Sequence, residues 1–215
     1  MGTPPKEFWE QFKITPGAFS TAEALAIFNI VSSIKYSRVG DWVETYIELG
    51  SHRGKSSQAI AAAIKKGVLY CVEPEFENVD WLNDFNRLNK YGCDVITISD
   101  YSTNVLPTFN KLTFAFVDSG THSDDLVMIE SKMLEDKIIR GGVVAYHDKG
   151  SQFTKVDEAY SYLLSTGKYE EIKINWNEIF DYLKENNISE DDNNSWHKYP
   201  ELPHPPNFIG ALKRI

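Results

Sequence analysis

From Thr45 onwards, short apolar runs alternate with longer stretches in which apolar residues recur every three or four positions. The short runs predict β-strands, and the longer stretches predict helices. Strands that alternate with helices form a mostly parallel sheet with helices on both faces, so the pattern predicts the α/β class. The seven predicted strands are Thr45–Leu49, Val68–Val72, Val95–Ile98, Phe114–Val117, Val143–Tyr146, Tyr169–Ile174 and Asn207–Lys213. The predicted helices are Ser56–Lys66, Trp81–Lys90, Leu106–Asn110, Asp124–Ile139 and Val156–Leu164.

The start of the chain has a different pattern. Ser20 and Glu23 have the spacing of a capping box, and the apolar stripe that continues to Ile34 predicts a helix. Its apolar face is broad, so we expect the helix to pack on something larger, as does the aromatic segment around Phe8. We therefore predict an N-terminal helical extension over residues 1–44.

The rest of the chain, residues 45–215, is predicted to form one α/β domain with an insert at 175–206 between its last two strands. The insert combines aromatic and polar residues, a composition that suits a lid or a sugar-stacking surface. An acidic helix and loop that pack on the core or on a second subunit are the alternative. The aromatic residues are Trp176, Phe180, Tyr182, Trp196 and Tyr199.

The charge balance narrows the choice of partner. The 215 residues include 22 Lys and Arg against 31 Asp and Glu, a net charge of −9. Such an acidic chain is not expected to bind nucleic acid, because that affinity comes largely from cationic side chains. No run reaches the roughly 20 apolar residues that cross a bilayer, and the start lacks a signal-peptide core. We expect a cytoplasmic protein with a small-molecule partner and no membrane partner, and a homo-oligomer remains open.

The two cysteines also favour a cytoplasmic location. Cys71 and Cys93 both lie in apolar or strand-like surroundings. We therefore expect buried, reduced thiols rather than a disulfide, as is usual in the cytosol.

The clearest motif follows the first predicted strand and runs into the next helix. Gly50 allows a sharp turn and the close approach of a ligand, and Gly54 allows close packing where the helix starts. A glycine-rich turn that binds nothing is the alternative for these glycines alone. The segment is Glu48-Leu49-Gly50-Ser51-His52-Arg53-Gly54-Lys55-Ser56.

Acidic residues at the ends of the next two strands support a ligand-binding loop. Glu73 ends the second strand, where an acid can accept both ribose hydroxyls, and Asp100 follows the third, where it can reach an adenine edge. With Glu48, these acids line one crevice at the carboxyl ends of the strands. A single acid at a strand end is more often a turn former or a helix cap, and it is their joint placement that indicates a binding site.

The spacing of the loop glycines excludes two phosphate-binding motifs. The loop lacks the Gly-x-Gly-x-x-Gly pattern, and only three residues separate Gly50 from Gly54, too few for a phosphate loop. Glu48 would repel phosphates and attract a cation. The predicted cofactor is a positively charged nucleoside without phosphates.

Four motifs together resemble the class I S-adenosylmethionine-dependent methyltransferases, most closely the branch of small O-methyltransferases and macrolide-sugar methyltransferases. This resemblance implies a Rossmann-like fold, S-adenosylmethionine as cofactor and methylation of a hydroxyl on a small molecule or a sugar. The motifs are Glu48-Leu49-Gly50-Ser51-x-x-Gly54, Glu73, Phe116-Val117-Asp118-Ser119-Gly120-Thr121-His122-Ser123 and Gly141-Gly142-Val143-Val144-Ala145-Tyr146-His147-Asp148.

The resemblance also implies roles for the cofactor-binding residues. Gly50 and the backbone around it would hold the methionine part, with Glu48 near its ammonium group and Glu73 on the ribose. Asp100 and its two neighbours would face the adenine, and Asp118 would lie next to the sulfonium. The full implied set is Glu48, Gly50, Ser51, Gly54, Glu73, Asp100, Tyr101, Ser102 and Asp118.

The implied catalytic residues are Asp118, His122, His147 and Asp148. In metal-dependent members of the branch, carboxylates at the positions of Asp118 and Asp148 hold magnesium. Here Lys149 follows Asp148 and His147 precedes it, so a metal-free site is the alternative, in which either histidine takes the hydroxyl proton. The rival functions are an NAD-dependent oxidoreductase and a non-catalytic cofactor-binding module.

Overall fold

The computed structural model describes residues 2–35, 43–76, 85–120, 124–189 and 208–215. Its strands are β1 (Thr45–Leu49), β2 (Val68–Val72), β3 (Asp94–Ile98), β4 (Leu112–Val117), β5 (Ile138–Tyr146), β6 (Tyr169–Glu171) and β7 (Gly210–Arg214). They form a seven-stranded sheet in the order β3-β2-β1-β4-β5-β7-β6, in which β7 is antiparallel to both of its neighbours and the other pairs are parallel. The prediction of a Rossmann-like, mostly parallel sheet is confirmed.

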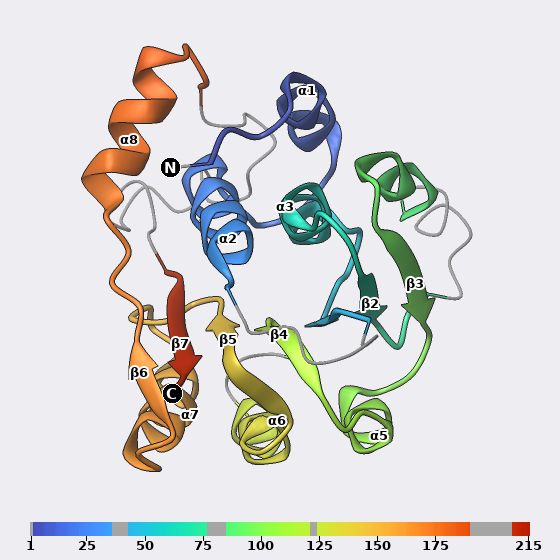
Figure 1. Ribbon diagram of the computed structural model, residues 1–215, viewed down its shortest axis with the longest axis vertical. Coiled ribbons are helices and arrows are strands. Elements are labelled where there is room, and N and C mark those ends of the chain that lie inside the picture. Colours follow the sequence, from blue (N-terminus) through green and yellow to red (C-terminus); the bar gives the residue numbers. More distant parts are fainter. Residues whose placement is uncertain (1, 36–42, 77–84, 121–123, 190–207) are drawn as a thin grey trace.

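Helices cover both faces of this sheet. The α-helices are α1 (Lys6–Ile14), α2 (Thr21–Ser33), α3 (Lys55–Ala63), α5 (Ser102–Val105), α6 (Leu126–Leu134), α7 (Thr154–Ser165) and α8 (Trp176–Glu185), and the 3₁₀-helices are η1 (Arg87–Tyr91) and η2 (Leu106–Thr108). In Figure 1 the sheet runs across the middle, with α1, α2, α3 and α8 above it and α5, α6 and α7 below. No helix in the described ranges is long and apolar enough to cross a membrane.

Alternating side chains of the central strands supply two hydrophobic cores, because successive residues of a strand point to opposite faces. Tyr46 of β1 packs with the helices above the sheet, and Ile47 packs with those below. The helices α1 and α2 share the upper core with α3, so the N-terminal residues and the sheet are packed as one unit. This packing brings the connection between α1 and α2 over the carboxyl ends of the strands.

Most predicted elements differ from the structure by one or more residues at their ends. The strand predicted from Val143 is part of the longer β5, because Gly141 takes a left-handed φ of +82° and lets the strand continue through an irregular register with β4. The earlier start of β5 also shortens α6 relative to the predicted helix Asp124–Ile139. The strand β6 ends at Glu171 rather than at Ile174, and α3 ends at Ala63 rather than at Lys66.

Other predictions fall partly outside the described residues. The predicted helix Trp81–Lys90 begins there, and its described end is the 3₁₀-helix η1. Asn207, the predicted start of the last strand, is also outside. The helix α5 was not predicted, since its four residues are too few for a periodic pattern.

The predicted insert begins with α8, which packs against α2. Ile179 and Leu183 of α8 are buried in the upper core, and Trp176 stacks on Phe180 with ring centroids 6.5 Å apart. Among the described residues, none of α8 lines either of the two cavities presented below. Trp196 and Tyr199 lie outside the described residues.

Candidate functional site

The loop after β1 brings the chain against the end of β4. Gly50 has a φ of +83°, and a Cβ atom at this position would overlap the backbone carbonyl oxygen of Asp118. Only glycine allows this close approach. The Gly50 N–H also donates to the Val72 carbonyl at 2.9 Å, which ties the loop to β2. The loop is thereby fixed between the ends of three strands.

Two cavities meet at this loop. The first, which we call the His147 cavity, has a volume of about 320 Å³ and is lined by Gly50, Ser51, Asp118, His147 and Asp148 among others. The second, the Glu73 cavity, has a volume of about 430 Å³ and is lined by Gly50, Glu73, Tyr101, Ser102 and Asp118 among others. Gly50, His52 and Asp118 line both. A ligand that passes over Gly50 would therefore reach both cavities.

Glu73 occupies the position predicted for the ribose acid, at the end of β2 and on the wall of the second cavity. Its carboxylate accepts the backbone N–H of His52 at 3.0 Å and that of Glu75 at 3.3 Å. These bonds fix the carboxylate on the side of the loop that faces the cavity.

Glu48 is the predicted residue whose position differs most from expectation. Its side chain is fully buried behind the loop, where its carboxylate accepts hydrogen bonds from Ser56 Oγ and Ser57 Oγ of α3. It lines neither cavity, so the implied contact with a ligand ammonium is replaced by a contact with α3. Burial raises the pKa of Glu48 to about 7, although the serine hydrogen bonds partly offset this shift.

Four further predicted residues divide into two that line a cavity and two that do not. Tyr101 is exposed and Ser102 is buried, and both line the Glu73 cavity. Asp100 instead accepts the backbone N–H of Tyr101 at 2.7 Å and the Asn104 side chain at 2.8 Å, so it holds the start of α5. Gly54 lines neither cavity and is the N-cap of α3, with a φ of +82°.

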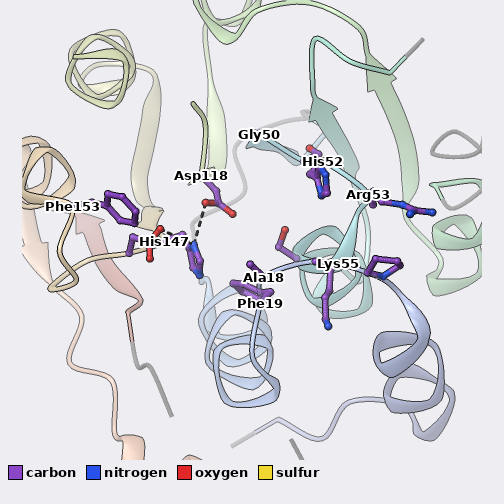
Figure 2. Close-up of a pocket in the computed structure, with 14 residues that line it drawn as sticks. Ala18, Phe19, Gly50, His52, Arg53, Lys55, Asp118, His147 and Phe153 are labelled. Atoms are coloured by element: carbon purple, nitrogen blue, oxygen red, sulfur yellow. Dashed lines mark hydrogen bonds and ion pairs between the residues drawn. The ribbon is translucent and has the colours of Figure 1, made fainter. Parts of the chain in front are cut away.

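The ends of β4 and β5 bring Asp118, His147 and Asp148 together. His147 Nδ1 lies 3.1 Å from Asp118 Oδ1 and 3.4 Å from Asp148 Oδ2. Figure 2 shows Asp118 and His147 pointing toward each other, with the segment that carries Ala18 and Phe19 facing them. The side chain of Asp118 keeps 19% of its surface exposed, against 4% for His147, so Asp118 is the more accessible of this pair.

The environment of His147 favours its protonated form. Burial alone would lower the pKa of His147, but the charges of Asp118 and Glu23 outweigh burial and raise the pKa well above its usual value. Phe19 and Phe116 pack around the imidazole, with ring centroids 5.3 and 6.4 Å away. The result is a rigid, cationic ring between carboxylates.

Sequence reasoning missed three features of this cavity. Residues 16–19, between α1 and α2, form one wall, and Lys55 and Phe153 form parts of others. Glu23 lies 3.5 Å from His147. The capping box was the only available signal for Glu23, and the structure contains that box as well.

Two further residues of interest are His122 and Lys149. His122 lies outside the described residues, so its role as a base stays a prediction. Lys149 turns away from the carboxylates, because its Nζ pairs with Asp157 at 3.0 Å and lies over the Tyr160 ring. Its charge is therefore paired with Asp157 rather than with the carboxylate of Asp118 or Asp148.

The cluster also fits a divalent ion. Asp118, His147 and Asp148 each offer one ligand atom, and these atoms lie within 4.8 Å of one another. Carboxylate oxygens with an imidazole nitrogen suit first-row divalent metals, and the two carboxylates alone suit magnesium. The predicted ligands Asp118 and Asp148 are thus close enough to share an ion.

The two cysteines play no part in these cavities. Cys71 and Cys93 are free and buried, as predicted. Burial raises the pKa of both thiols, to about 11 for Cys93.

Comparison with known proteins identifies the domain that carries these cavities. Residues 47–149 match a family model described as a methyltransferase domain. The chain carries a methyltransferase domain. The strand-end loop, the Glu73 cavity and the His147 cavity all lie within or against the matched methyltransferase residues.

Solved structures share the fold of the methyltransferase domain at low sequence identity. A protein from Corynebacterium glutamicum is 10% identical, with a TM-score of 0.63 over 99% of this chain and 91% of that one. An O-methyltransferase from Bacillus cereus, crystallised with SAH, is 12% identical, with a TM-score of 0.61 over 98% and 92%. An rRNA methylase from Streptococcus thermophilus is also 12% identical, with a TM-score of 0.55 over 87% and 93%. Among curated protein sequences, none matches the chain significantly.

Proposed function

We propose that this methyltransferase transfers the methyl group of S-adenosylmethionine to a hydroxyl oxygen of a small molecule or a sugar. The observation that carries the proposal is the Asp118–His147 pair in the cavity that adjoins the Glu73 cavity at Gly50. In this arrangement the nucleoside part of the cofactor occupies the Glu73 cavity, and the acceptor occupies the His147 cavity. Asp118, which lines both, lies where the methyl group is transferred.

The chemistry needs alignment and a place for one proton. The acceptor oxygen attacks the methyl carbon as the carbon–sulfur bond breaks, which leaves S-adenosylhomocysteine and a methyl ether. The hydroxyl proton passes to the carboxylate of Asp118, the more accessible member of the pair, while the protonated His147 ring holds that carboxylate in place. Phe19 and the neighbouring residues 16–18 cover one side of the cavity.

Asp118, His147 and Asp148 would hold a divalent ion if the enzyme uses one. Such an ion supplies Lewis acidity that binds the acceptor oxygen and lowers its pKa. The protein residues alone still orient the acceptor, because the same three side chains form the wall of the cavity.

The charge of the chain supports a small acceptor over a nucleic acid. The structural neighbours include rRNA methylases, but their similarity to this chain is one of fold only. A net charge of −9 opposes binding to phosphate backbones, and a cavity of about 320 Å³ suits a small molecule. We therefore propose a small-molecule or glycosidic acceptor and no nucleic-acid partner. We also propose that the enzyme acts in the cytoplasm without a membrane partner, as a monomer or a homo-oligomer.

An acceptor panel tests the proposal directly. The protein is incubated with methyl-labelled S-adenosylmethionine and with phenolic, catecholic and glycosidic compounds, each paired with an amine or thiol analogue, and with RNA. Label in ether products supports hydroxyl methylation. Label in the amines, thiols or RNA would refute it, and binding of the cofactor without any product would favour the non-catalytic module.

S-adenosylhomocysteine is expected to raise the melting temperature. A ligand that binds only the native state at 100 times its dissociation constant stabilises the protein by about 2.7 kcal/mol. Thermal unfolding is measured with the nucleoside and, as a control, with NAD. A shift with NAD alone would contradict the cofactor assignment.

Glu73→Ala is expected to weaken S-adenosylhomocysteine binding by about 1 to 3 kcal/mol, because a charged hydrogen-bond acceptor for the ribose is removed. Calorimetry measures the change. Glu170→Ala removes the same charge from an exposed position on β6 and serves as the control. Equal affinities in folded wild-type and Glu73→Ala protein would place the ribose elsewhere.

A further inference from the structure

Glu23 is a buried acid that lies outside the matched methyltransferase residues, on the N-terminal helix α2. Its side chain has no exposed surface, so its carboxylate must be compensated by protein groups. Its position as the third residue of α2 explains one contact: one oxygen, Oε2, accepts the Ser20 N–H at 2.9 Å in the capping box. The capping box therefore explains the position of one of the two carboxylate oxygens and not of the other.

The other oxygen of Glu23 faces the methyl-transfer site. Oε1 lies 3.5 Å from His147 Nε2 and accepts the Phe208 N–H at 3.4 Å. A carboxylate suits this place because it presents acceptors in both directions, whereas an amide presents an oxygen in only one. The carboxylate of Glu23 therefore caps α2 and also contacts His147 and Phe208.

His147 Nε2 is a buried polar atom that requires a nearby acceptor. This nitrogen is buried and forms no hydrogen bond within the described part of the chain, so the Glu23 carboxylate at 3.5 Å is the group that compensates its N–H. The other ring nitrogen, Nδ1, faces both Asp118 and Asp148. The imidazole thus lies between Glu23 on one side and two acids at the cavity on the other.

We propose that Glu23 is a positioning residue for methyl transfer, whose carboxylate holds the His147 ring at Nε2 and so keeps Nδ1 turned toward Asp118 and Asp148. This role rests on the proposed function and extends it to a helix outside the matched domain. A base or a metal ligand is commonly oriented by a third group on its far side, so the role holds whether or not an ion binds. The rings of Phe19 and Phe116 prevent the imidazole from swinging away.

The test compares Glu23→Met with a matched variant of the same cap. Glu23→Met keeps the length of the side chain and removes both acceptor oxygens. Ser20→Ala removes the bond from the Glu23 N–H to Ser20 Oγ, at 3.1 Å, and leaves the Glu23 carboxylate in place. Both variants weaken the start of α2, but only the first changes the surroundings of His147.

The first measurement is the nitrogen NMR spectrum of the histidine rings in the complex with S-adenosylhomocysteine, assigned by the signal that His147→Asn removes. Wild-type protein and Ser20→Ala are expected to show a protonated Nε2, and Glu23→Met is expected to lose that proton. A wild-type Nε2 without a proton would overturn the proposal even if Glu23→Met fails to fold. An unchanged Nε2 in folded Glu23→Met would overturn it as well.

The second measurement is turnover with a hydroxyl acceptor from the panel. Glu23→Met is expected to lower kcat at least about tenfold, with the affinity for S-adenosylhomocysteine within about twofold of wild type, while Ser20→Ala keeps kcat within about twofold. Equal kcat in wild-type and Glu23→Met protein would overturn the positioning role. The NMR measurement needs no acceptor, so it tests the Glu23–His147 contact independently of turnover. A protein that methylates no hydroxyl would refute the proposed function without deciding whether Glu23 contacts His147.

Discussion

Asp118→Asn and His147→Asn are each expected to lower turnover by about 10²- to 10⁴-fold, with little change in cofactor affinity. General acid–base groups contribute rate factors of this size. The two side chains lie 3.1 Å apart at the wall of the acceptor cavity, so loss of either one disrupts the pair that receives the hydroxyl proton. Turnover is measured with the panel acceptor, and affinity by calorimetry with S-adenosylhomocysteine.

Asp136→Asn is the matched control for this prediction. Asp136 is exposed and pairs with Lys168 and Arg214, away from either cavity. It should leave turnover at the wild-type level. Wild-type turnover in both Asp118→Asn and His147→Asn would show that the reacting groups lie elsewhere, even with the cofactor assignment intact.

A chelator separates the two forms that this site can take. Loss of activity with EDTA, restored by magnesium or manganese, together with a severe effect of Asp148→Asn, would assign the carboxylates to an ion. Activity that is unaffected by EDTA would assign proton transfer to the Asp118–His147 pair alone. The mutational prediction above is the same in both cases.

The sequence was sufficient where an element depends on local pattern. The strands β1 and β2 were predicted to the residue, because each is a short, mostly apolar segment bounded by polar or glycine residues. The longer β5 was not, because its first half passes through the glycine pair at 141–142, which breaks the apolar run that a strand prediction depends on. Pairing with β4 fixes that segment, and pairing is not visible in a local window.

The acidic residues likewise divide into those whose positions could be predicted from local pattern and those fixed by contacts between distant segments. Strand ends placed Glu73 and Asp118 beside the cavities, because parallel strands end at one edge of a sheet. Glu48 was read as a ligand contact, although it alternates with Ile47 and Leu49 and so must point to the face that α3 covers. The contact between Glu23 and His147 spans 124 positions in the sequence, and the capping box already explained Glu23 locally.

Glu48 leads to the second large prediction, in which stability depends on pH. The pKa of Glu48 is raised from 4.5 to about 7 by burial, so between these values the unfolded chain is ionised at this position while the folded protein keeps its proton. A raised folded-state pKa stabilises the protein fully below the unfolded pKa, and this stabilisation is lost as pH rises through the folded pKa. At about 1.4 kcal/mol per unit, this group should remove about 3 kcal/mol from the free energy of unfolding between pH 4.5 and 7.

Glu48→Gln isolates this effect because an amide does not titrate. The amide can still form hydrogen bonds with the two serines of α3. Urea unfolding from pH 4.5 to 8 is expected to show wild-type stability falling by about 3 kcal/mol relative to Glu48→Gln, with most of the fall complete by about pH 7. Glu170→Gln, at an exposed position, should follow the wild-type curve. Parallel curves for wild type and Glu48→Gln would mean that the carboxylate is ionised in the folded protein at low pH. Its two serine hydrogen bonds would then outweigh burial.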